Sequence, residues 1–370
     1  YNACVIYLNA AGYGPLPERT RAALNEFNDR RHRGELRDAD LMSALAGARE
    51  NAARLIGCTA AEIALAPNTQ VAINVAVNAV LECAQERDVI LISAGEFPAN
   101  VYPWLALQQH GFTVELIPAD ERGLPCEDVL INRVTDGDVA AISVSFVQFA
   151  SGFRANLDAL SRVCRDYNTL FVVDAIQGLG AVPLDVRDTP CDLLACGGQK
   201  WLCSPWGSGF TYIRDGLLQS FEPTYPGWLS FKATADFRSL TSYDYIFHDD
   251  GRRFETGSIA FQDQLGMSIS IDVLLERSVA AVWRHIEALQ EPIIEWAEKH
   301  DVEIVSDLTP DRRSGILCIR PRNAAGAHAA LVEANVACAF REQAIRLAPH
   351  YYNTLEEIEQ VLAVLDTVVK

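Results

Sequence analysis

The fold is decided by Asp192-Leu-Leu-Ala-Cys-Gly-Gly-Gln-Lys200-Trp-Leu-Cys-Ser-Pro-Trp-Gly-Ser-Gly-Phe210, a short apolar run that breaks into glycines and then presents one lysine, Lys200. An earlier apolar run, Leu170-Phe-Val-Val-Asp174-Ala-Ile-Gln177, ends on a carboxylate. Apolar runs of this length are typical of strands in a buried parallel sheet, where ligands lie beyond the carboxyl ends of the strands. We therefore expect Asp174 and Lys200 to lie at the same edge of such a sheet.

Strand-length apolar runs alternate with amphipathic helical patterns from about residue 60 to 215. This alternation predicts an α/β fold, with a mostly parallel seven-stranded sheet between helices. The expected strands are Glu62–Ala66, Asp88–Ser93, Thr113–Ile117, Val139–Ser145, Leu170–Asp174, Asp192–Cys196 and Gly209–Arg214. The expected helices include Thr69–Gln85, Val101–His110 and Asn156–Tyr167.

The pattern changes after about residue 260, where long helical segments precede short strands and a closing helix. This order of elements predicts a smaller α+β domain at the C-terminus. The expected elements are helices Asp263–Ser278, Val279–His300 and Leu355–Val369, and strands Val302–Ser306, Gly315–Arg320 and Ala344–Ala348. We expect an N-terminal segment at 1–15, a large domain at 16–257 and a small domain at 258–370. The loop-rich stretch 222–257 holds several aromatic residues and is a candidate for the wall of a cleft.

Composition limits the classes of partner. The chain has 370 residues and a net charge of −18, which argues against nucleic acid and favours small-molecule substrates. Its ten cysteines are scattered without a C-x-x-C pair or neighbouring histidines, so we expect reduced thiols in the cytoplasm and no metal site. The sequence opens with no signal peptide and has no apolar run long enough to span a membrane. Because it opens within a strand-like run, a natural N-terminus upstream remains open.

Pyridoxal phosphate (PLP) chemistry requires at least a lysine that can form a Schiff base and an aspartate that can hold a pyridinium nitrogen. Lys200 and Asp174 are the candidates for these two roles. Either residue alone has a plainer interpretation, as an exposed lysine beside a turn or as an aspartate capping a turn. An NAD-dependent Rossmann enzyme is a weaker interpretation, because no G-x-G-x-x-G follows the first strand.

With these motifs, and with Leu8-Asn9-Ala10-Ala11-Gly12 and Arg346-Leu-Ala-Pro-His-Tyr-Tyr-Asn353, the chain resembles class V aminotransferase-type PLP enzymes of fold type I. That group includes aminotransferases, cysteine desulfurases, kynureninase and isopenicillin N epimerase. The resemblance implies PLP as cofactor, Lys200 as its Schiff-base lysine and Asp174 as the partner of its ring nitrogen. It also implies a homodimer with the site at the interface, because the position of Ser258 reaches across the interface in relatives.

The resemblance assigns further contacts residue by residue. Gln177 and Gln148 match groups near the phenolic oxygen of the cofactor, and Phe97 matches the residue that stacks on its ring. The expected phosphate contacts are Thr69 and Gln70 at a helix N-terminus, with Gln199 and Ser258. Gln199 replaces a histidine of many relatives and Ser258 a threonine. Taken alone, Thr69 could be a simple N-cap and Gln148 an ordinary loop residue.

Arg346 matches the arginine that binds the substrate α-carboxylate through a planar fork. Arg341 is either its neighbour or a solvated charge, and Asn9 is a weaker candidate on the substrate side.

The expected activity is that of a PLP enzyme acting on a small amino acid through an external aldimine, with transamination as the first choice. A lyase or epimerase is the alternative, and a non-catalytic PLP-binding protein is a third. Cys338 invites comparison with the sulfur-carrying cysteine of desulfurases, but only seven residues separate it from Arg346. Phe97 also replaces the histidine of desulfurases. We therefore expect Cys338 to be a structural residue of a buried strand.

Overall fold

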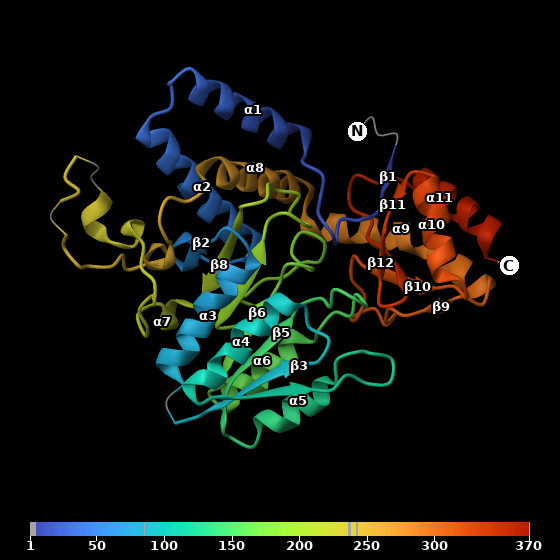
Figure 1. Cartoon of the computed structure of the whole chain (residues 1–370), viewed down its shortest axis with the longest axis horizontal. Helices are drawn as coiled ribbons and strands as arrows, with labels where there is room; N and C mark the ends of the chain where they lie inside the picture. Colours follow the sequence, from blue (N-terminus) through green and yellow to red (C-terminus); the bar gives the residue numbers. More distant parts are fainter. Residues whose placement is uncertain (1–4, 85, 236–237, 242, 370) are drawn as a thin grey trace.

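A seven-stranded sheet forms the centre of the larger part of the molecule (Figure 1). The structure is a computed structural model that describes residues 5–84, 86–235, 238–241 and 243–369. The strand order is β2-β8-β7-β6-β5-β3-β4, and β8 alone runs against the others within this sheet. The strands are β2 (Ile63–Leu65), β3 (Val89–Ser93), β4 (Thr113–Ile117), β5 (Val139–Ser145), β6 (Leu170–Asp174), β7 (Leu193–Gly197) and β8 (Gly209–Ile213). The expected α/β fold with a mostly parallel sheet is confirmed.

Helices cover both faces of this sheet because its strands are apolar on both sides. On β3, Leu91 belongs to one buried cluster, while its neighbours Ile90 and Ile92 belong to another. The first cluster includes residues of α2 (Asp38–Ile56), α6 (Leu157–Asp166) and α8 (Phe261–Arg277), and the second includes residues of α3 (Thr69–Cys83) and α4 (Tyr102–Leu105). Alternate side chains along each strand therefore bury against opposite helical layers.

The observed helices of the larger part follow the expected ones with small changes. The expected helix Thr69–Gln85 is α3, and Gln85 lies outside the described residues. The expected helix Val101–His110 is α4 followed by a 3-10 turn, η3 (Ala106–His110). Four further helices of this part were not anticipated from the sequence: α1 (Glu18–His32), α2, α5 (Glu127–Val134) and α7 (Asp215–Leu218).

A smaller sheet of order β12-β13-β10-β9 lies near the C-terminus and is antiparallel throughout. The long helix α9 (Val279–Lys299) leads to it, and Figure 1 shows this unit beside the larger one. Its other elements are β9 (Glu303–Ile304), β10 (Leu317–Arg320), α10 (Ala324–Glu333), β11 (Val336–Ala337), β12 (Ala339–Arg341), β13 (Ala344–Leu347) and α11 (Leu355–Val368). Residues of α9, β10, β13 and α11 share one apolar cluster.

The N-terminal segment joins the two sheets. β1 (Ile6–Tyr7) pairs in parallel with β11, and backbone hydrogen bonds link Leu8 and Ala10 to Ala348. The chain then approaches the end of β7, where the Gly14 amide donates to the Gln199 carbonyl at 2.8 Å. This path brings the N-terminal segment to the Lys200 turn.

Two other segments bear on the expected domain division. Helix α8 packs against α1 and α2 of the larger part before α9 leads to the smaller sheet. The boundary at residues 257 and 258 stays a prediction.

The loop-rich stretch 222–257 was a candidate for the wall of a cleft. Its described part lines a pocket against α2 through Leu229, His248 and Glu255, and that pocket contains none of the candidate site residues.

The described cysteines are all free thiols, and Cys4 lies outside the described residues. Within the described ranges, no helix combines the length and the apolar character that crossing a membrane requires.

Candidate active site

Lys200 lies in a tight turn at the carboxyl end of β7. The turn is held by the Gly198 amide, which donates to the Ser208 carbonyl at 2.9 Å, and by the Cys203 amide, which donates to the Lys200 carbonyl at 2.9 Å. Gly14 lies against the outside of this turn, where a Cβ would be only 2.3 Å from the Lys200 carbonyl oxygen. A larger residue at position 14 would therefore displace the lysine.

Asp174 ends β6, the neighbour of β7, as the sequence predicted. It is buried, and its Oδ1 accepts a hydrogen bond from the Ile176 amide at 3.0 Å. Burial raises the pKa of this carboxyl to about 6, with the hydrogen bond from Ile176 and the positive charge of Lys200 acting in the opposite direction. At neutral pH, Asp174 is therefore mostly ionised and able to pair with a protonated ring nitrogen.

Burial has the opposite effect on Lys200, whose pKa it lowers to about 8. Asp174 partly offsets this shift, and the positive charges of Arg346 and Arg341 add to it. These charges come from both sheets, so the two units together set the ionisation of the lysine. An amine with a pKa near 8 has a substantial neutral fraction near neutral pH and can attack a carbonyl carbon.

The start of α3 forms a cradle suited to a phosphate group. The N-cap of α3 is Asn68, whose Oδ1 accepts from the Val71 amide at 3.0 Å, so Thr69 is not needed as the cap. Thr69 is 5% exposed, and among the described residues its buried Oγ1 has no hydrogen-bond partner. A Cβ placed on Gly197 would lie 3.0 Å from Thr69 Oγ1 and 2.5 Å from Gln199 Oε1.

These features fit the phosphate of PLP, because a helix N-terminus attracts anions and an unpaired buried hydroxyl requires a partner. Gln199 contributes an amide that can donate through its nitrogen. Gln70, the other expected contact in this helix, is exposed.

Phe97 lies beside the lysine amine, with its ring centroid 5.4 Å from Lys200 Nζ. It is 44% exposed and meets the Phe149 ring edge-to-face at 5.3 Å between centroids. One face of an aromatic ring is thus available next to the lysine, as the expected stacking contact requires.

The two expected glutamines have protein partners. Gln177 is buried and donates to the Ala11 carbonyl at 3.1 Å, while its Oε1 accepts from Trp201 Nε1 at 2.9 Å. It therefore ties the N-terminal segment to the residue after Lys200. Gln148 donates to Glu96 Oε1 at 2.8 Å. The expected contacts of both residues with a phenolic oxygen stay predictions.

Arg346 lies on β13 of the smaller sheet and is 3% exposed. Its Nη1 donates to the Phe149 carbonyl at 2.7 Å, and its Nε has no partner among the described residues. Burial lowers its pKa to about 10, so the guanidinium remains charged at neutral pH. A buried guanidinium with donors left over fits a substrate carboxylate. The Oδ1 of Asn9 is likewise buried and unpartnered in the described part of the chain, while Arg341 is exposed.

Ser258 is separate from this group. It is exposed and lines a surface pocket with residues of α1, including Phe27 and Arg31. None of the other candidate residues lines that pocket. The contact of Ser258 with the cofactor, and the second subunit that it implies, stay predictions.

Cys338 lies between two short strands, β11 and β12, rather than within one buried strand. Its side chain is partly buried against the apolar cluster of the smaller sheet. Burial raises the pKa of its thiol to about 12, which keeps it protonated at neutral pH. A protonated thiol is a poor nucleophile.

Two residues of the site were missed from the sequence. Glu96 directly precedes Phe97 and is buried, and a carboxylate at a strand end beside a predicted ring contact was an available signal. His350 is fully buried, and its Nε2 lies 2.8 Å from the Trp201 carbonyl oxygen. Burial lowers its pKa to about 4, so a neutral imidazole joins the smaller unit to the Lys200 turn. No local pattern distinguishes this histidine.

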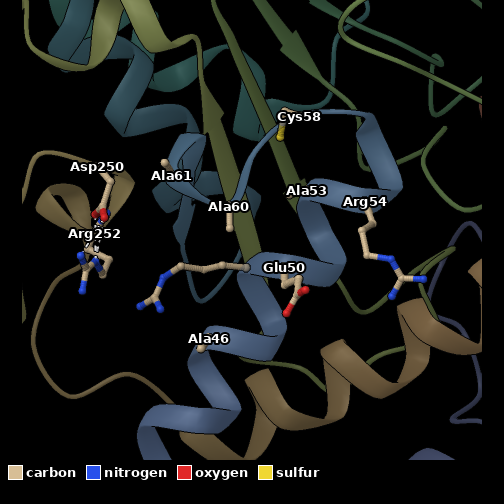
Figure 2. Close-up of a pocket in the computed structure, with 10 residues that line it drawn as sticks. Ala46, Glu50, Ala53, Arg54, Cys58, Ala60, Ala61, Asp250 and Arg252 are labelled. Carbon is tan, nitrogen blue, oxygen red and sulfur yellow. Dashed lines mark hydrogen bonds and ion pairs between the residues drawn. The ribbon is translucent and has the colours of Figure 1, made fainter.

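A separate pocket lies on the surface beside α2 and contains none of the candidate site residues. Figure 2 shows Arg54 on one side of it and the ion pair of Asp250 with Arg252 on the other. Arg49 in the same pocket pairs with both oxygens of Glu255. Arg49 and Arg252 thus already have carboxylate partners.

Comparison with known proteins identifies relatives along nearly the whole chain. The family model described as "Aminotransferase class-V" matches residues 6–361. An uncharacterized aminotransferase of Bacillus subtilis, YcbU, is 29% identical over 85% of this chain and 81% of its own length. A probable cysteine desulfurase of Methanothermobacter thermautotrophicus is 26% identical over 96% of this chain and 92% of its own length.

The fold also matches solved structures of the cystine C-S lyase C-DES. One is a complex with its reaction product, cysteine persulfide, and shares 22% identity at a TM-score of 0.86, covering 98% of this chain and 97% of the other. A variant of C-DES with glycine covalently linked to the PLP cofactor matches with the same identity and TM-score, over 98% of this chain and 96% of its own.

Proposed function

This chain belongs to the class-V aminotransferase family and is a PLP-dependent enzyme, and from that premise we propose that it transfers the amino group of a small amino acid. Lys200 would hold the cofactor through its aldehyde carbon, and Asp174 would pair with its ring nitrogen. Thr69 and Gln199 hold the phosphate, supported by the unpaired Oγ1 of Thr69 and the space above Gly197. Bound PLP supplies an electron sink for the negative charge that develops at the substrate Cα.

Arg346 binds the substrate carboxylate and thereby orients the Cα bonds. The support is its burial together with a spare Nε donor. Phe97 covers the site and excludes water on its side. With PLP bound, Lys200 would be the base that moves the proton at the substrate Cα.

The observation that favours transamination is the pairing of Lys200 with Phe97 rather than with a proton-carrying side chain. Transamination can use one base on one face of Cα, whereas epimerisation by two bases needs a proton donor on the opposite face. Desulfuration needs a reactive thiol, and the thiol of Cys338 is protonated because burial raises its pKa to about 12.

A lyase reaction is the second candidate, since the probable cysteine desulfurase relative spans nearly the whole chain. Purified enzyme should be incubated with a panel of amino acids, with and without a 2-oxo acid. The expected result is conversion of one amino acid to its 2-oxo acid, matched by amination of the acceptor. Release of ammonia or sulfide without an acceptor would establish the lyase instead, and loss of optical purity alone would establish an epimerase.

The working form is a homodimer. Ser258 is exposed and lines a surface pocket without the other candidate residues. The loop-rich segment before it, yellow in Figure 1, projects from the larger part, and its exposed side chains include Tyr225, Tyr243, Tyr245 and Ile246. Contiguous exposed apolar side chains favour burial in an interface. Twofold pairing is the commonest way for a soluble chain to achieve this.

A further inference from the structure

Glu96 is a buried carboxylate at the carboxyl end of β3 that the proposed chemistry does not use. It accepts four hydrogen bonds: Oε1 from the Ser145 amide at 2.8 Å and from Gln148 Nε2 at 2.8 Å, and Oε2 from Asn100 Nδ2 at 3.1 Å and from the Ser145 hydroxyl. Within the described ranges no lysine or arginine forms an ion pair with it. A carboxylate held only by neutral donors is an unusual choice for a core, where packing alone would favour an apolar residue.

Trp104 fixes the orientation of the Asn100 amide, and with it the direction of the hydrogen bond from Asn100 to Glu96. The indole Nε1 of Trp104 can only donate, and it donates to Asn100 Oδ1 at 3.3 Å. Ser143 Oγ donates to the same oxygen at 2.6 Å. The Nδ2 of Asn100 must therefore face Glu96, and Asn100 cannot turn its amide around without leaving Trp104 unpaired.

Each oxygen of Glu96 thus faces a group that can only donate: the Asn100 amide nitrogen on one side and the Ser145 backbone amide on the other. The remaining partners, the Ser145 hydroxyl and the Gln148 amide, can each reverse. The ionised form of Glu96 therefore requires Gln148 to present its nitrogen. A proton on Oε1 would require Gln148 to present its oxygen instead.

Gln148 connects this network to the cofactor site. Its side chain makes one hydrogen bond among the described residues, the one to Glu96, so its other amide atoms remain for a ligand. The residue after it, Phe149, contacts Phe97 with its ring and accepts from Arg346 through its carbonyl. Ser145 pairs in register with Asp174 on the adjacent strand.

We propose that Glu96 is a positioning residue, which fixes the amide orientation of Gln148 toward the cofactor and changes it when Glu96 takes up a proton. This inference rests on the PLP site and not on the choice between transamination and the other reactions. The charged neighbour of Glu96 is Asp174 on β6, which in turn interacts with Lys200 on the turn after β7. Burial and the charge of Asp174 raise the pKa of Glu96 to about 7, within the working range of an enzyme.

The test is a pH titration of the visible absorbance of the PLP-loaded protein between about pH 5.5 and 9, with no substrate present. In the unaltered protein we expect a spectral step near pH 7, in addition to the titration of the lysine-bound cofactor itself. Glu96→Gln should abolish this step, because the amide does not titrate in this range. Gln148→Met should also abolish it, because the apolar side chain cannot transmit the change.

Glu127→Gln is the matched control. Glu127 is also buried, but it pairs with Arg312 and accepts from the Asn156 amide, away from the cofactor site. Its variant should titrate as the unaltered protein does. Because Glu96→Gln places an amide nitrogen among donors and can impair folding, Gln148→Met tests the proposal independently.

Turnover gives a second readout. If Glu96 acts through Gln148, the double variant should lose no more than about threefold in kcat/KM beyond Gln148→Met alone, since effects within one network are not additive. A spectral step that survives in Gln148→Met would overturn the proposal and assign the proton to the Ser145 side. Additive losses in the double variant would also overturn it, and would reduce Glu96 to a structural role.

Discussion

At the scale of single residues, burial shifts the ionisable groups of the site in opposite directions. It lowers the pKa of Lys200 to about 8 and raises that of Asp174 to about 6, because both shifts disfavour the charged form. The two residues still retain opposite charges in part at neutral pH. The site therefore has a lysine that is partly neutral and an aspartate that is mostly ionised, the states that cofactor attachment requires.

Attachment of PLP to the protein without cofactor should follow the ionisation of Lys200. Its rate should rise about tenfold per pH unit below pH 8 and level off above it, because only the neutral amine attacks the aldehyde. Arg346→Ala should move the midpoint upward, since a nearby positive charge is removed, and Arg341→Ala should move it less. Stopped-flow absorbance measures these rates. A midpoint near the ordinary lysine value of about 10.4 would contradict the role of burial.

Arg346 should set the affinity for the substrate carboxylate. Arg346→Ala should weaken substrate binding by about 2–5 kcal/mol, as for the loss of one partner of a buried charge pair. Amines that lack the carboxylate should lose their disadvantage against the parent amino acid in this variant. Spectral titration with each ligand provides the affinities. If the preference for the amino acid persists, the carboxylate binds elsewhere, and Arg341→Ala becomes the variant to compare.

Thr69 offers a test of the phosphate cradle. Thr69→Val keeps the shape of the side chain and removes the hydroxyl, so the affinity for PLP should fall roughly 10- to 150-fold, the equivalent of about 1.5–3 kcal/mol for a hydrogen bond to a charged group. Thr113→Val, at an exposed position on β4, is the control and should bind PLP normally. Equilibrium dialysis of PLP measures both. Equal affinities would place the phosphate away from the start of α3.

At the scale of elements, the sequence predicted best where a segment is buried on both sides. β5 is buried and wholly apolar or small, and its bounds were predicted without error, as were those of β6. The bounds of the edge strand β4 were also predicted without error, although most of its residues are exposed or half-buried. The stretch around Cys338 was expected to be one buried strand but forms two short ones, β11 and β12, because two or three residues carry no period and their pairing comes from partners distant in the chain. His350 and the hydrogen-bond partners of Glu96 depend on tertiary contacts that no local pattern encodes, although the position of Glu96 at a strand end was a local signal.

A variant of Cys338 can test whether this thiol is structural or takes part in the reaction. Cys338→Ala should leave turnover within a few-fold, because loss of one partly buried sulfur affects packing more than chemistry. The assay is steady-state turnover of the preferred substrate, with sulfide release from cysteine measured in parallel. Sulfide release that disappears in the variant, while cysteine still perturbs the cofactor spectrum, would move desulfuration ahead of transamination.

At the scale of the whole molecule, the site is assembled from both sheets and from the N-terminal segment. Lys200 and Asp174 come from the large sheet, Arg346 from the small one, and the Ala11 carbonyl and the Gly14 amide from the segment between them. Relative movement of the two sheets would change the distance between Arg346 and Lys200. Ser258 lines a surface pocket that contains none of the other candidate residues.

Mixing two inactive variants can establish whether Ser258 serves a second subunit. Lys200→Ala lacks the lysine but keeps Ser258, and Ser258→Trp keeps the lysine but fills the space beside the partner's phosphate. If Ser258 acts across the interface, a mixed dimer has one complete site, formed by Lys200 of one chain and Ser258 of the other. Refolding equal amounts together should restore about a quarter of full activity, since half of the dimers are mixed and each has one of two sites. If Ser258 serves its own chain, mixing restores nothing.

The net charge of the chain makes a further prediction about the dimer. Because each chain has a net charge of −18, added salt should favour dimer formation by screening the repulsion between the subunits, and sedimentation at low and high salt measures the fraction of dimer. An active monomer, or a fully active Ser258→Trp variant, would exclude a shared site.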